Sequence, residues 1–216
     1  MRSMILGGLV VHLLAIACTA GPTYTFTGLT RNDPTNVATG ISQLWFQVGR
    51  SDQASVFTFH NDGPLPCSVT DIYIDDDAGT LDSITFMTNG PGVRYRIGAR
   101  PSDPPGAEVA VPPFMTTPGL SAQSVPPTIR NGIGPGEWLT VGFDLAEGSD
   151  HADLLHGLDA GTIRVALHVQ GFGNGGSESF VHIPAVPGPA SITLVCLGLL
   201  MAGRLREQEK LRNPLD

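Results

Sequence analysis

Apolar and polar residues alternate with a period of two along the middle of the chain, and this feature limits the possible folds most. The clearest case runs over residues 163–170, where Ile, Val, Leu and Val alternate with Arg, Ala, His and Gln. Residues 139–145 repeat the pattern after Gly134-Pro135-Gly136, a turn sequence. Because successive side chains of a strand point to opposite faces, this period predicts strands with one dry and one wet face. Helical bundles need a period near 3.6 and are excluded.

Shorter stretches of the same kind predict a fold built almost entirely from strands. They lie at residues 24–29, 44–48, 57–59, 69–74, 81–87, 93–97 and 180–183. About nine short strands joined by turns that contain Gly, Pro and Asn are typical of a single β-sandwich, which we favour over a closed barrel.

One short helix is predicted between residues 150 and 160. Ser149 or Asp150 can cap its start, and three leucines between 154 and 158 share a face before Gly161. Negative charge in the first turn, at Asp153, is favoured by the helix dipole.

The segment of residues 99–136 differs from the rest because it holds nine of the 18 prolines. Proline cannot donate to a central strand ladder. The segment is therefore predicted to be a long ordered loop or an excursion at the edge of a sheet. It would act either as a functional loop or as a rigid cover over one end of the sandwich.

Residues 1–20 have the layout of a secretory signal peptide. Met1 and Arg2 give a positive start, an apolar stretch follows, and Cys18-Thr19-Ala20 supplies the small residues of a cleavage site. We predict cleavage after Ala20, so that a folded domain of residues 21–185 is exported.

The C-terminal end has three consecutive parts. Val186-Pro187-Gly188-Pro189 precedes an apolar run of 12 residues at 192–203, and Arg204 and Arg206 follow it. As a helix the run would span roughly 18 Å, whereas a bilayer core is about 30 Å thick. The run is therefore predicted to be a short, transient transmembrane helix with its arginines on the cytoplasmic side.

This combination resembles the PEP-CTERM sorting signal of Gram-negative and related bacteria, which exosortases recognise. Val186, Pro187 and Pro189 match the Val-Pro-Glu-Pro element of that family, whereas Gly188 replaces its Glu. Family members usually end soon after the arginines, whereas this chain continues through residues 207–216, a predicted cytoplasmic tail. The resemblance implies a sorting signal over residues 186–206. It further implies the export machinery, signal peptidase and an exosortase-like transpeptidase as partners.

The order of the predicted elements also resembles the β-sandwich ectodomains of other PEP-CTERM proteins, most of which have no assigned activity. The elements that suggest it lie at residues 55–61, 72–76, 132–137 and 169–181.

Charge narrows the possible partners of the domain. The whole chain has a formal net charge of -8. The domain of residues 21–185 holds 7 Arg, no Lys and 17 acidic residues. A nucleic-acid partner is therefore not expected, because binding to phosphates needs a basic face.

Two tryptophans are the candidate ligand-binding residues. Trp45 and Trp138 are out of phase with the apolar positions of their strands, so both indoles are expected on the polar face. An exposed indole can stack on a sugar ring. Alternatively, the predicted helix or the proline-rich segment covers both side chains.

Asp75 and Asp77 are the candidate metal ligands. With Gly79 they resemble half of a calcium-binding loop, but the distal Glu is missing. The alternative is a solvated acidic turn after a strand. No other cofactor is expected.

Three functions remain open at this stage. The first is a non-enzymatic structural or interaction module, sorted by an exosortase-type system. It would sit at the cell surface or in the extracellular matrix, in contact with exopolysaccharide. The second is a carbohydrate- or calcium-binding module. The third is a secreted hydrolase, for which no paired catalytic residues can be named.

Overall fold

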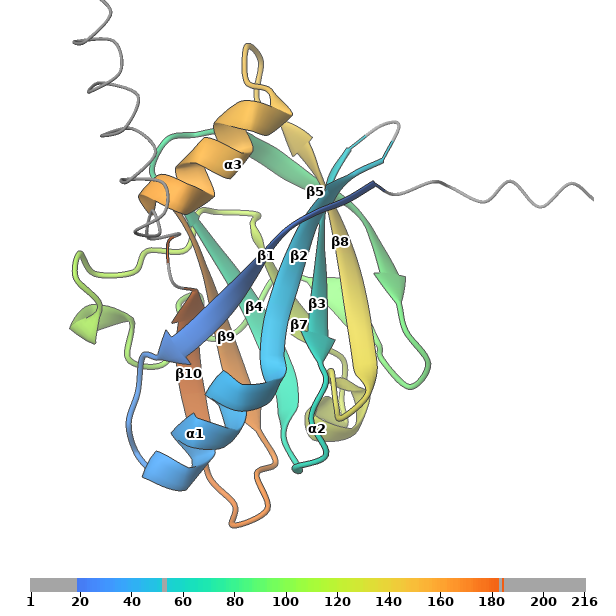
Figure 1. Ribbon diagram of the computed structural model, residues 1–216, viewed down its shortest axis with the longest axis vertical. Helices are drawn as coiled ribbons and strands as arrows, with labels where there is room; N and C mark the ends of the chain where they lie inside the picture. The colour runs from blue at the N-terminus through green and yellow to red at the C-terminus, as the bar shows by residue number, and fades with distance from the viewer. Residues whose placement is uncertain (1–18, 52–53, 183, 185–216) are drawn as a thin grey trace, which may run out of the picture.

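The computed structural model describes residues 19–51, 54–182 and 184 (Figure 1). These residues form ten strands, which are β1 (Thr19–Gly28), β2 (Leu44–Arg50), β3 (Ser55–Asn61), β4 (Ser68–Asp76), β5 (Leu81–Asn89), β6 (Tyr95–Ile97), β7 (Ser121–Ser124), β8 (Glu137–Leu145), β9 (Ile163–Gln170) and β10 (Ser177–His182). The helices are α1 (Pro34–Gln43), α2 (Thr128–Asn131) and α3 (His151–Ala160), with a 3-10 turn η1 (Ala107–Val109). The predicted all-β class and the helix at α3 are confirmed, and each predicted strand has a counterpart.

The strands form one antiparallel sheet in the order β5-β8-β3-β2-β1-β10-β9-β4-β7-β6, bent into a nearly closed, barrel-like shape (Figure 1). Strand β1 joins the two halves, because Thr23–Thr25 pair with β2 whereas Phe26–Gly28 pair with β10. This continuous sheet differs from the predicted sandwich of two sheets. Period-two alternation shows which face of a strand is dry, but it does not show whether two layers share a strand.

The inner face of the sheet is filled by aromatic rings. Phe46 lies at the centre, with ring centroids 5.1 Å from Tyr24, 5.5 Å from Phe26 and 5.5 Å from Phe57. All four side chains are buried. Burying each ring contributes about 1.5–3 kcal/mol, so this cluster and the aliphatic residues around it fix the sheet.

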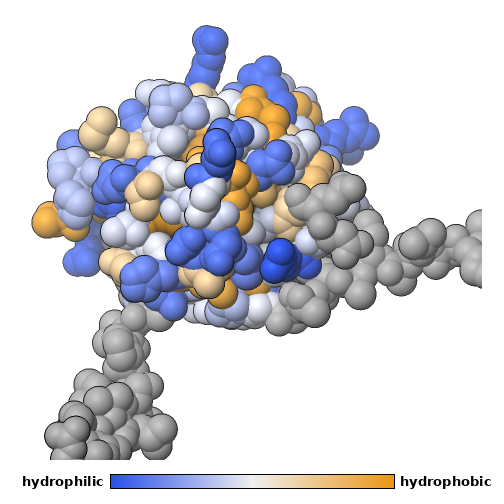
Figure 2. All heavy atoms as spheres, turned by 90° about the horizontal axis from the view of Figure 1, so that it is seen from above, coloured by the Kyte–Doolittle hydropathy of each residue, from blue (hydrophilic) through white to orange (hydrophobic). Residues whose placement is uncertain are grey.

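Helix α3 covers one end of the barrel (Figure 1), and hydrophilic and hydrophobic side chains are mixed on the surface seen from that end (Figure 2). Asp150 is its N-cap, its carboxylate accepts the backbone N–H groups of Ala152 and Asp153, and Gly161 ends it in a left-handed conformation. Leu154 and Leu158 bury its apolar face. The predicted cap, apolar face and stop are thus all present.

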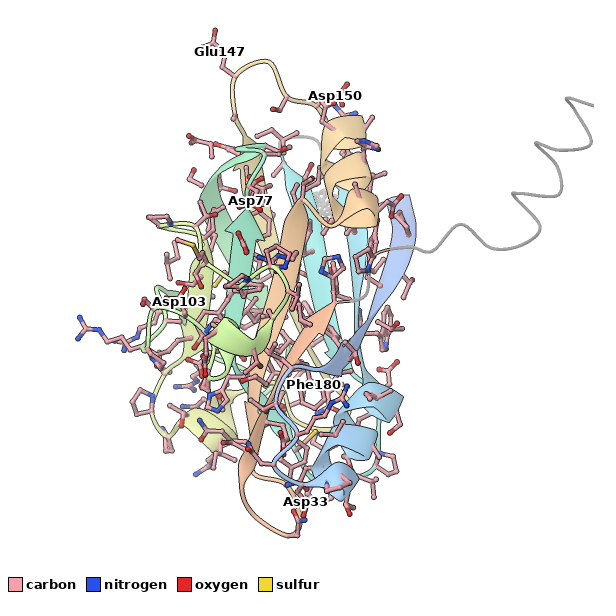
Figure 3. The ribbon with its side chains drawn as sticks, turned by 90° about the vertical axis from the view of Figure 1, so that its left-hand side faces the viewer. Asp33, Asp77, Asp103, Glu147, Asp150 and Phe180 are labelled. Carbon is pink, nitrogen blue, oxygen red and sulfur yellow. The ribbon has the colours of Figure 1, made fainter. Side chains whose placement is uncertain are left out.

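Helix α1 lies at the opposite end and was not predicted. Asp33 caps it, and Pro34 is its first residue. Figure 3 shows Asp33 and Asp150 at the two ends of the molecule. The helix packs closely on β10, because a Cβ at Gly40 would lie 2.1 Å from the ring of Phe180.

The proline-rich segment covers the outer face of β4 and β9, contrary to the expected wet face (Figure 3). Tyr73, Phe114 and Ala166 form a second buried cluster there. Arg164, predicted to face solvent, is 9% exposed and donates hydrogen bonds to the carbonyls of Pro112 (2.6 Å) and Pro113. The segment thus seals one outer face, whereas outer-face side chains of β2, β3 and β8 retain partial exposure.

Candidate functional site

Three ring-bearing side chains form a row on the outer face of β2, β3 and β8. Trp45 on β2 is the register partner of His60 on β3, and His60 is the register partner of Trp138 on β8. Register partners on one face have Cβ atoms about 4.5–5.5 Å apart. We call Trp45, His60 and Trp138 the aromatic row.

The geometry of the aromatic row is fixed by stacking and by one hydrogen bond. The rings of Trp45 and His60 lie 4.0 Å apart and are inclined by 8°, a parallel stack. The indole N–H of Trp45 donates to the carboxylate of Asp62 at 2.7 Å. His60 covers one face of the indole, and on the other side the register partner of Trp45 on β1 is the exposed Thr25.

The aromatic row keeps a neutral imidazole near pH 7. Partial burial lowers the pKa of His60 below its ordinary value of 6.5, and the nearby Asp62 carboxylate offsets part of this effect. A neutral ring stacks on the indole without the desolvation cost of a buried charge.

A row of hydroxyl and amide groups runs beside the aromatic row. Its members are register partners across five strands: Thr23, Gln47, Thr58, Thr140 and Thr88. The hydroxyls of Thr58 and Thr140 lie 3.0 Å apart, and the amide of Gln47 donates to the carbonyl of Gly21 at 3.2 Å. These groups offer donors and acceptors to a ligand on this face, and we call them the polar row.

Phe86 closes the other side of the polar row. It is the register partner of Gly142, and a Cβ on that glycine would lie 2.2 Å from the Phe86 ring. The ring therefore rests on Gly142 and remains 39% exposed. Trp138 and Gly142 are four residues apart on β8, which spans about 14 Å at a strand's rise per residue. The face thus carries polar groups between two aromatic borders.

The two predicted tryptophans are thus brought to one face, and both retain partial exposure. Helix α3 lies at one end of the barrel and residues 107–114 lie over β4 and β9, so neither encloses the two indoles. The sequence analysis did not identify His60, the polar row or Phe86. The alternation marked Thr58, His60 and Thr140 as outward-facing, but their adjacency depends on strand register.

The predicted calcium ligands do not form an open loop. Asp75 is 2% exposed, and its carboxylate pairs with Arg164 and accepts the backbone N–H of Met115 at 3.0 Å. Asp77 is exposed at the turn after β4. Within residues 19–51, 54–182 and 184, no group of three His, Cys, Asp or Glu side chains could hold a metal ion.

A polar pocket lies at the α3 end, where the Oγ of Ser55 is 2.9 Å from the Nδ1 of His151. Burial lowers the pKa of His151, so its imidazole is neutral near pH 7. The adjacent Asp150 carboxylate accepts backbone N–H groups of α3. In the described part of the chain no third side chain hydrogen-bonds His151, as a catalytic triad would require. The contact instead fastens α3 to β3.

The remaining predicted residues, Val186, Pro187, Gly188, Pro189, Arg204 and Arg206, lie outside the described residues, as do residues 1–18 of the predicted signal peptide. Among the helices that are described, none has the length and apolarity needed to cross a bilayer.

Comparisons with known proteins add no family to these observations. No family model, no curated protein and no solved structure matches the chain.

Proposed function

We propose that the domain is a glycan-binding module and that the outer face of β2, β3, β8 and β5 is its binding surface. The observation that carries the proposal is the partly exposed aromatic row of Trp45, His60 and Trp138 beside the polar row. Sugar rings present apolar C–H faces and polar hydroxyl edges. Aromatic side chains pack on the former, and hydroxyl and amide groups hydrogen-bond the latter.

Pre-organisation supports this proposal. The groups stand on paired strands, Trp45 is held by Asp62, and Thr58 is held by Thr140. A surface that is ordered before binding loses less conformational entropy when a ligand docks. We take the module to be non-enzymatic. At the Ser55–His151 contact, the neighbouring Asp150 carboxylate is engaged in capping α3.

Affinity electrophoresis tests the proposal. The full chain, in a mild non-ionic detergent, is run through native gels containing neutral and acidic polysaccharides. We expect at least one polymer to retard it, and Trp45→Ala and Trp138→Ala to weaken that retardation about tenfold or more. Met115→Ala, which removes a 72% exposed side chain of the proline-rich segment, is the control and should be retarded normally. The proposal fails if no polymer retards the chain. It also fails if a variant that carries both tryptophan substitutions is retarded as strongly as the wild type.

We also infer that the domain is exported and sorted to the cell surface or to an exopolysaccharide-rich matrix. This inference is supported by the signal-peptide layout of residues 1–20 and by the PEP-CTERM-like arrangement of residues 186–206. The partners are then the export machinery, signal peptidase and an exosortase-like transpeptidase, with transient attachment to the membrane. A glycan-binding face would give such a protein a partner at that location.

A further inference from the structure

A pocket of about 620 Å³ lies at the start of β8, beside the aromatic row. Its lining residues are Gly92, Arg94, Pro126, Pro127, Arg130, Asn131 and Glu137. Its volume is within the range of about 300–1,000 Å³ that is usual for small-ligand pockets. The sequence analysis did not identify this pocket, because its arginines lie 36 residues apart.

The two arginines of the pocket have fixed backbones and exposed side chains. The backbone N–H of Arg94 donates to the carbonyl of Asn131 at 2.8 Å, and its carbonyl accepts the N–H of Val125. The N–H of Arg130, on α2, donates to the carbonyl of Pro127 at 3.1 Å. In the part of the chain that the structure describes, neither guanidinium forms an ion pair with a carboxylate. Both are therefore available to an anion.

Glu137 is the acidic residue of the pocket lining, and one of its two carboxylate oxygens is hydrogen-bonded within the protein. One carboxylate oxygen accepts the backbone N–H of Gly134 at 2.7 Å. The other lies 2.3 Å from the position that a Cβ on Gly92 would take. Two arginines against one carboxylate leave the pocket locally positive in a chain of net charge -8.

Residues 90–94 form a loop that contacts Trp138 at Gly90 and lines the pocket at Gly92 and Arg94. The N–H of Gly90 donates to the carbonyl of Trp138 at 3.0 Å, and a Cβ on Gly90 would lie 3.2 Å from the indole nitrogen. The nitrogen edge of the indole therefore lies against the loop that continues to Gly92 and Arg94. Glu137 immediately precedes Trp138 on β8 and is the register partner of the buried Asn61, so its side chain points to the opposite face of the strand from the indole.

We propose that this pocket is a subsite for the carboxylate of an acidic sugar, a uronic acid unit of the glycan. Arg94 and Arg130 bind the carboxylate, since the planar guanidinium matches its two oxygens. Glu137 accepts a hydrogen bond from a sugar hydroxyl, and the glycan continues around the start of β8 to the face that carries Trp138. This inference rests on the proposed glycan-binding function and specifies its substrate class.

The test compares a uronate polymer with its uncharged methyl ester and with a second uronate polymer. The full chain is run in native gels with polygalacturonate, with its methyl-esterified form, and with alginate as a second uronate polymer. We expect stronger retardation by polygalacturonate or alginate than by the esterified polymer. Arg94→Gln and Arg130→Gln should lower affinity for the uronate polymer about tenfold each. Arg96→Gln is the matched control, because Arg96 is exposed, hydrogen-bonds Gln123 and does not line the pocket.

The outcomes separate this inference from the proposed function. Equal retardation by the charged and esterified polymers would overturn the subsite, and so would an Arg96→Gln effect as large as that of Arg94→Gln. Retardation by neutral polymers alone, lost in Trp138→Ala, would overturn the subsite and leave the glycan-binding face intact. Retardation by no polymer would overturn both.

Discussion

At the scale of single residues, His182 couples the stability of the fold to pH. Its Nδ1 accepts the backbone N–H of Val165 at 3.0 Å, and its Nε2 lies 3.2 Å from the carbonyl of Leu158. The pKa of this imidazole falls from 6.5 to about 4, chiefly because of burial; the Leu158 hydrogen bond and Asp159 oppose the shift, and the nearby Arg164 adds to it. The folded state therefore holds a neutral ring.

We expect the free energy of unfolding to fall as pH is lowered from 6.5 to 4. Over this window the unfolded chain binds a proton at His182 and the folded chain does not, which costs about 3 kcal/mol when complete. The measurement is urea unfolding between pH 7 and pH 4 for the wild type and for His182→Gln, which keeps an acceptor and a donor. The variant should show a shallower pH dependence, although the lowered pKa values of His60 and His151 leave part of the slope.

His156→Gln is the control for that measurement, because His156 is exposed on α3. Its pH profile should match that of the wild type. An identical slope for His182→Gln and the wild type would show that His182 does not carry the effect.

Among buried charges, Arg164 has a structural role. It pairs with Asp75, donates to two carbonyls of the proline-rich segment, and its guanidinium lies 5.2 Å from the centroid of Phe114. We expect Arg164→Met to lose about 3–5 kcal/mol of stability, because it leaves the Asp75 carboxylate buried without a cation. Thermal unfolding and limited proteolysis of the proline-rich segment measure this loss.

A double-mutant cycle identifies the cause of that loss. Asp75→Asn with Arg164→Met should be less destabilised than the sum of the single variants, since no unpaired charge remains. Arg96→Met, at an exposed arginine, should change stability by no more than about 0.5 kcal/mol. An Arg164→Met variant as stable as Arg96→Met would contradict the anchoring role.

At the scale of elements, the apolar periodicity of the sequence predicts α3 but not α1. The buried face of α3 carries leucines at helical spacing, whereas that of α1 consists of Asn36, Thr39, Gly40 and Gln43. Because these residues are polar or small, α1 has no helical periodicity of apolar residues, which is the pattern that predicts α3. A local signal did exist, because Asp33-Pro34 is a cap followed by a proline suited to the first helical position.

The same distinction holds for the strands that carry the candidate site. Alternation within β2 and β8 was enough to place Trp45 and Trp138 on outward faces. Their assembly into one row depends on the pairing of β3 with β8, which joins residues about 80 positions apart. Register of this kind arises from packing of the whole sheet, so His60 could not be assigned to the row from the sequence.

At the scale of the whole molecule, the described fold is self-contained between the two predicted processing sites. The side chains of its main core cluster come from residues 24–180. A cut after Ala20 removes only the pairing of Thr19 with Arg50 and of Ala20 with Gly49, which a register shift separates from the remaining β1–β2 pairs. Strand β10 ends at His182, before the sorting signal begins at Val186. Processing at the two predicted sites would therefore leave the core and the candidate site intact.

We expect mass spectrometry of protein from an exosortase-bearing host to find an N-terminus at Gly21 and a C-terminus close to Val186–Pro189. Arg204→Ala with Arg206→Ala removes the positive flank that orients the apolar run, so this variant should stay in the membrane fraction at a larger mass. Arg212→Ala, which changes a charge in the tail beyond that flank, is the matched control and should be processed normally. Because the two forms differ only beyond the end of strand β10, both should show the same unfolding midpoint. Release of the double variant at the wild-type mass would count against exosortase-type sorting while leaving the glycan-binding face untouched.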